Sequence, residues 1–129
     1  MALCVTIHAS GLAWALHWLR THELPNHYLS SLGLFMGIAS WIVLLHIVEI
    51  VVWAALFVVN GALPDLQTAV YFSAVTYTTT GYGDVVLPQG HRWDGGVEAL
   101  TGILMCGWST GFFFSVVNRL QQLRQAGEP

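Results

Sequence analysis

The chain has 129 residues, of which 55% are hydrophobic and only 9% are charged, and its formal net charge is −3. About a quarter of the residues of a soluble domain are charged, so this composition excludes an ordinary soluble domain and indicates a protein that lies in a lipid bilayer. There is no lysine and no run of arginines, which excludes a basic nucleic-acid-binding surface. The sequence predicts an all-α membrane protein, because helices satisfy their own backbone hydrogen bonds in lipid.

Residues 1–19 form an apolar segment that could barely cross a hydrocarbon core of ~30 Å at ~1.5 Å per residue. A signal peptide would need a basic start and a small-residue cleavage site, and the segment has neither. A helix lying flat on the membrane would need a strongly charged face. We favour a third membrane-spanning helix, with the flat helix as the alternative. The N-terminal unit, helix and cytoplasmic link together, is predicted over residues 1–29.

The next apolar block, residues 32–59, exceeds the ~20 residues that a spanning helix needs and has no polar face. It predicts a membrane-spanning helix, here called the outer helix, over residues 30–59. Its only ionisable residues are His46 and Glu49, which lie three positions apart and therefore share one helix face. His8 could lie at a comparable depth.

Ionisable groups inside a membrane are costly, so His46 and Glu49 need an explanation. A hydrogen-bonded cluster that fastens one helix to another is the first interpretation. A pH-sensing pair is the second, because histidine titrates near neutrality. A metal site is the third, and two or three ligands are few for a metal.

A short helix is predicted over residues 65–78, after Asn60 and Gly61 end the outer helix. Asp65 is a favourable N-cap. A helix of ~13 residues is roughly 20 Å long and cannot span the membrane. A re-entrant half-helix is therefore expected, and its non-helical continuation must be shielded from lipid.

That continuation, residues 79–84, reads Thr-Thr-Gly-Tyr-Gly-Asp. With the preceding Thr76-Tyr77-Thr78, the segment resembles the filter of the potassium channel pore domain, in the two-transmembrane ion channel family. Such a filter is a column of inward-facing carbonyl groups, which needs unusual backbone conformations that Gly81 and Gly83 can adopt at little steric cost. The chain looks like a small prokaryotic member of that family with an extra N-terminal helix.

The resemblance implies that the filter binds K⁺ through backbone carbonyl groups, with the Thr79 hydroxyl as the innermost ligand. The implied filter residues are Thr79, Thr80, Gly81, Tyr82 and Gly83, with K⁺ at the first four. Two positions depart from the family pattern. Thr80 stands where valine or isoleucine is usual, so its hydroxyl needs a partner behind the filter. Val75 stands where some bacterial relatives have a glutamate, and we expect Tyr71 to hydrogen-bond Asp84 instead.

The last apolar block, residues 97–117, predicts an inner helix over residues 96–118, followed by a short cytoplasmic tail, residues 119–129. Gly107 lies where relatives have a hinge glycine, and close helix packing is an equally good interpretation. Positive charge collects in cytoplasmic loops, so the arginines place the first link and the tail inside. These arginines are Arg20, Arg119 and Arg124.

One chain has one filter segment, and filters of this kind use four, so a homotetramer is expected around a pore domain of residues 30–118. We expect passive K⁺ conduction in a cell membrane, no enzyme chemistry and no cofactor apart from K⁺ as the permeant ion. A weakly selective cation channel and a non-conducting accessory subunit are the alternatives. No arginine-rich voltage-sensing helix is visible, so gating is expected to come from the filter, the helices or a separate regulatory partner.

Overall fold

The computed structural model describes residues 1–22 and 28–126, and its described part is helical with one long loop. The elements are α1 (Ala2–Thr21), α2 (Tyr28–Val59), α3 (Leu66–Tyr77), a 3₁₀ turn (Gln89–His91) and α4 (Arg92–Ala126). Three helical stretches are long and apolar enough to cross a membrane: Ala2–Thr21, Ser31–Val59 and Gln89–Leu123. This agrees with the predicted all-α membrane fold and with a third candidate span at the N-terminus.

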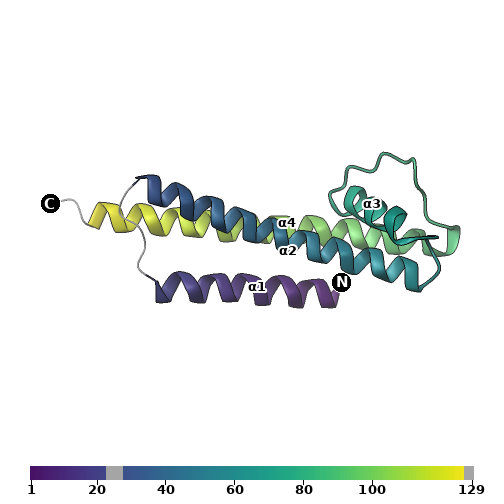
Figure 1. Ribbon diagram of the computed structural model, residues 1–129, viewed down its shortest axis with the longest axis horizontal. Helices are drawn as coiled ribbons and strands as arrows, with labels where there is room; N and C mark the ends of the chain where they lie inside the picture. Colours follow the sequence, from purple (N-terminus) through teal and green to yellow (C-terminus); the bar gives the residue numbers. More distant parts are fainter. Residues whose placement is uncertain (23–27, 127–129) are drawn as a thin grey trace.

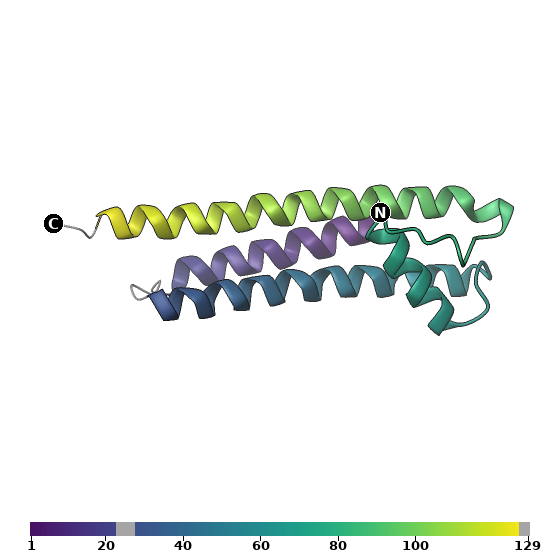
Figure 2. The same ribbon diagram turned by 90° about the horizontal axis from the view of Figure 1, so that it is seen from above.

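Helices α2 and α4 run side by side along the whole molecule, and α1 lies against both of them (Figures 1 and 2). The indole Nε1 of Trp41 donates to the Gly11 carbonyl oxygen at 3.1 Å, which joins α2 to α1. The first turns of α1 reach the level of α3, where Cys4 is buried in one core with Trp53 and Phe57. A second core at the other end joins the three long helices through Leu19, Ile38, Val116 and Leu120.

The half-helix α3 leaves from one end of the molecule and its loop returns to the same end, beside the start of α4 (Figure 1). Asp65 is the N-cap, as predicted: its carboxylate accepts from the Thr68 backbone N–H at 2.8 Å. Hydrogen bonding to Thr68 lowers the pKa of this exposed carboxyl group. The opposite end of the molecule carries the end of α1, with Arg20, and the end of α4, with Arg119.

Helix α4 is longer than the predicted 96–118 at both ends. It begins at Arg92 because Asp94 favours the first turn, and it continues to Ala126 because leucine, glutamine and arginine are good helix formers. Most of the predicted tail is therefore helical. The predicted link after α1 lies largely outside the described residues, as do residues 127–129.

Candidate functional site

The loop after α3 has an alternating backbone conformation. Thr79, Gly81 and Gly83 have positive φ angles of 59°, 53° and 77°, and the intervening Thr80 and Tyr82 do not. In a regular strand successive carbonyl groups point to opposite sides, whereas alternation of the sign of φ turns them toward the same side. The sequence predicted unusual backbone conformations at the two glycines, and both are left-handed. Thr79 was not foreseen, because a β-branched residue rarely adopts one.

Backbone hydrogen bonds hold this loop against the end of α3. The N–H of Thr79 donates to the Thr76 carbonyl oxygen at 2.9 Å, and the N–H of Gly81 donates to the Val75 carbonyl oxygen at 3.0 Å. The hydroxyl oxygens of Thr78 and Thr80 lie 2.9 Å apart. Thr78 already donates to the Ala74 carbonyl oxygen, so its oxygen accepts from Thr80. The Thr80 hydroxyl thus has a hydrogen-bond partner in Thr78.

The outer end of the loop is held by a side-chain hydrogen bond. The Tyr71 hydroxyl donates to Asp84 Oδ2 at 2.6 Å, as expected from the sequence, and the Val85 N–H donates to Asp84 Oδ1 at 3.1 Å. The bond from Tyr71 lowers the pKa of the Asp84 carboxyl group, and the same bond raises the pKa of the Tyr71 phenol. The bond from Tyr71 therefore favours the ionised form of Asp84.

Helix α4 touches the end of α3 through a glycine that the sequence analysis missed. A Cβ atom at Gly102 would lie 1.9 Å from the Tyr77 carbonyl oxygen, so only glycine allows this approach. Gly107, the hinge candidate, has no atom within 4 Å of its Cβ position, and α4 continues unbroken through it. Of these two glycines of α4, Gly102 is therefore the one that is closely packed within the chain. The hinge role of Gly107 stays a prediction.

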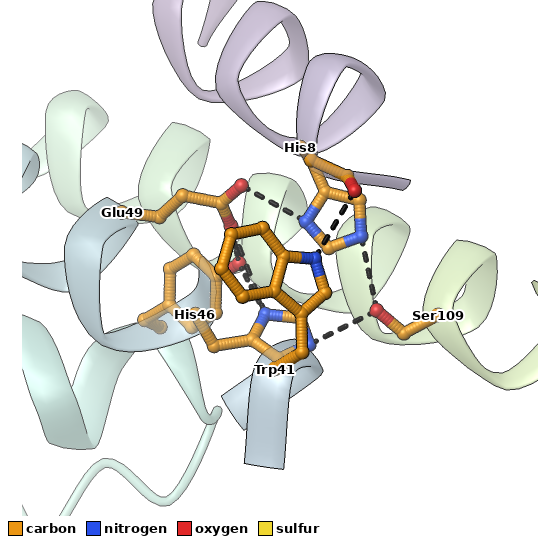
Figure 3. Close-up of polar contacts among 7 residues, drawn as sticks. His8, Trp41, His46, Glu49 and Ser109 are labelled. Atoms are coloured by element: carbon orange, nitrogen blue, oxygen red, sulfur yellow. Dashed lines mark hydrogen bonds and ion pairs between the residues drawn. The ribbon is translucent and has the colours of Figure 1, made fainter. Parts of the chain in front are cut away.

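Five side chains from all four α-helices form a closed ring of hydrogen bonds below the loop (Figure 3). His8 of α1 contacts Glu49 of α2 through Nδ1 (3.0 Å to Oε1) and Ser109 of α4 through Nε2 (2.9 Å). Ser109 Oγ also lies 3.2 Å from His46 Nε2. His46 Nδ1 lies 2.9 Å from the hydroxyl of Tyr77, the last residue of α3, and Tyr77 donates to the other oxygen of Glu49.

The number of protons carried by the five side chains decides whether every contact in the ring is a hydrogen bond. Each of the five contacts needs one hydrogen to be a hydrogen bond. Five protons are available if Glu49 is a carboxylic acid and both histidines are neutral, because Glu49, His8, His46, Tyr77 and Ser109 then carry one each. A His8 imidazolium paired with a Glu49 carboxylate contains the same number of protons. In both arrangements the ring has no net charge, which suits a site at membrane depth. Losing one proton would leave one contact without a hydrogen and one buried negative charge.

The ring corresponds to the first interpretation of His46 and Glu49, a hydrogen-bonded cluster that fastens one helix to another. It fastens α1, α2 and α4 to the residue that ends the half-helix. The sequence placed His8 at a comparable depth but did not reveal Tyr77 or Ser109, because a tyrosine and a serine in apolar helices carry no signal of their own. The pH-sensing interpretation stays a prediction.

Long apolar helices around a re-entrant half-helix, followed by a loop with alternating backbone conformation, define a membrane protein built to pass ions. Residues 41–119 of the 129 match the family described as Ion channel. The match covers more than half of the chain, so the protein belongs to this ion channel family. No curated protein and no solved structure matches the chain.

Proposed function

We propose that this chain is one subunit of a homotetrameric potassium channel in a cell membrane. The ion sites are the backbone carbonyl groups of Thr79, Thr80, Gly81 and Tyr82. The observation that supports this proposal is the alternation of positive φ angles at Thr79, Gly81 and Gly83. Carbonyl groups that point to one side can replace the hydration shell of a dehydrated K⁺ ion.

Four copies are needed because one loop offers carbonyl groups from one direction only. In the single chain, residues 78–84 are exposed, and Tyr82 has 72% of its surface accessible. Closed fourfold symmetry would surround an ion with four such loops. The ends of the half-helices would then face the axis, and their partly negative C-termini favour a cation.

Selectivity for K⁺ over Na⁺ depends on how firmly the loop keeps its shape. Three features oppose its collapse: the N–H groups of Thr79 and Gly81 bound to α3, the Thr78–Thr80 pair, and the Tyr71–Asp84 bond. Since the Thr80 hydroxyl is hydrogen-bonded to Thr78, it has no need to turn toward the ions. This favours a K⁺-selective channel over the weakly selective alternative.

Ion flux from liposomes that contain the purified protein tests the proposal. We expect K⁺ efflux that Ba²⁺ blocks, with little Na⁺ flux. Equal flux of both ions would indicate the weakly selective channel, and no flux in a folded protein would indicate the accessory subunit.

Gly81→Ala is the decisive variant, because alanine at a φ of +53° costs roughly 1–2 kcal/mol in each chain. Its matched control is Gly90→Ala, in the outer 3₁₀ turn, where φ is not positive and no atom lies within 4 Å of the Cβ position. Flux should fall in the first variant and persist in the second. Mass measurement of the intact assembly should give four chains, and a monomer in membranes would refute the proposal.

A further inference from the structure

We propose that His8, His46 and Glu49 form a binding site for a divalent transition-metal ion such as Zn²⁺. One ligand atom from each of these residues lies within 4.8 Å of the other two. His8 Nδ1 is 3.0 Å from Glu49 Oε1, and His46 Nδ1 is 3.7 Å from Glu49 Oε2. This site is separate from the proposed K⁺ sites and does not depend on them.

The distances suit a small ion. Zn²⁺ binds histidine nitrogen and carboxylate oxygen at ~2.0–2.2 Å, so neighbouring ligands of a tetrahedral site lie roughly 3.3–3.5 Å apart. His8 Nδ1 lies 3.0 Å from Glu49 Oε1, just below that range, and His46 Nδ1 lies 3.7 Å from the other carboxylate oxygen, Oε2. All three ligand atoms lie within 4.8 Å of one another, so the side chains would have to draw together around the ion.

The hydrogen-bond partners of the three proposed ligands are also compatible with a bound metal ion. A histidine that binds a metal through Nδ1 carries its proton on Nε2 and needs an acceptor there. Both Nε2 atoms lie against Ser109 Oγ, at 2.9 Å from His8 and 3.2 Å from His46, and a hydroxyl oxygen can accept two hydrogen bonds. Tyr77 donates to the second oxygen of Glu49, which would orient the carboxylate.

The donor set decides the class of ion. Two imidazoles and one carboxylate suit Zn²⁺, Co²⁺, Ni²⁺ and Cu²⁺, whereas Mg²⁺ and Ca²⁺ prefer oxygen ligands only. The bound ion replaces the ring proton shared by His8 and Glu49, so one proton leaves for each ion that binds. The side chains of His8 and Glu49 are fully buried and that of His46 is 17% exposed, so an ion would enter past His46.

A metal at this position would alter the fastening of the half-helix. In the ring, His46 Nδ1 contacts the Tyr77 hydroxyl, and metal binding would redirect that nitrogen to the ion. Tyr77 immediately precedes the loop, so we expect bound Zn²⁺ to change ion flux. This effect on flux rests on the proposed function, whereas metal binding itself does not.

Metal binding is measured on the full chain in detergent, in a Cys4→Ala/Cys106→Ala background. Both cysteines are free, so their thiols could bind Zn²⁺ independently of the proposed site. We expect about one Zn²⁺ per chain by elemental analysis, and Co²⁺ absorption bands typical of tetrahedral nitrogen and oxygen ligands. Absence of both in folded protein overturns the proposal without any further variant.

The variants test the assignment of ligands. His8→Gln and His46→Gln should weaken Zn²⁺ binding at least ~10-fold, and Ser109→Ala should weaken it ~10–100-fold as an outer-shell residue. The matched control is His22→Gln, at the exposed end of the same helix as His8. Equal affinity in His8→Gln and His22→Gln would show that the ring is only a hydrogen-bonded fastener. If a ligand variant does not fold, Ser109→Ala and the Co²⁺ spectrum of the parent protein decide.

Discussion

Gly102 offers the sharpest test of how the half-helix is positioned. In Gly102→Ala the new methyl group would lie 1.9 Å from the Tyr77 carbonyl oxygen and 2.8 Å from the carbonyl carbon. Real Cβ contacts stay above 3.0 Å, so α4 and the end of α3 must separate by at least 1.1 Å. The obstructing atoms are backbone, so no side-chain rotation relieves the clash.

The expected loss of stability follows from two opposing contributions. Overpacking in a well-packed core costs ~1–3 kcal/mol, and a backbone clash belongs at the upper end. Alanine recovers about 1 kcal/mol of helix propensity relative to glycine. We therefore expect Gly102→Ala to lower the free energy of unfolding by about 2 kcal/mol per chain, and to move Tyr77 away from its ring partners.

Thermal unfolding in detergent and K⁺ flux in liposomes measure the two consequences. The matched control is Gly96→Ala, in the same helix, where no atom lies within 4 Å of the Cβ position. It should be as stable as the parent protein or slightly more stable. If Gly102→Ala unfolds at the temperature of Gly96→Ala and conducts normally, the close approach of α4 to Tyr77 is wrong.

Three further predictions concern the loop and α4. Tyr71→Phe removes the 2.6 Å bond to Asp84, so current should decay faster during a sustained recording; unchanged decay would exclude a role for this bond. The same bond lowers the pKa of Asp84, so its contribution is present above the ordinary pKa of aspartate and is lost as pH falls through the lowered value. Tyr71→Phe should therefore shift the loss of current on acidification to higher pH, as a pH series of flux would show. Gly107→Ala should reduce open probability in single-channel recordings if Gly107 is a hinge, since alanine stiffens the helix by about 1 kcal/mol; Gly96→Ala, the control, should not.

The order of elements was accessible from the sequence. Hydrophobic blocks long enough to cross a membrane predicted the three long helices, and Asp65 marked the start of α3. Both signals could be read from the sequence because hydropathy and capping depend on neighbouring residues only. Unusual backbone at Gly81 and Gly83 was predicted for the same reason: a missing Cβ atom is a local property. The length of α4 was underestimated because the prediction followed hydrophobicity, whereas the polar residues at both ends of this helix favour helix without being hydrophobic.

Contacts between distant residues required the tertiary structure. His46 and Glu49 stand out in any apolar helix, but their partners His8, Tyr77 and Ser109 come from three other helices. Spacing along a helix says which residues share a face, and it does not say which face of another helix packs against them. Gly102 differs from Gly107 only in what lies opposite. The chain's own chemistry thus determined a helical membrane protein with an unusual backbone at two glycines of its loop. Packing alone decided which buried groups meet one another.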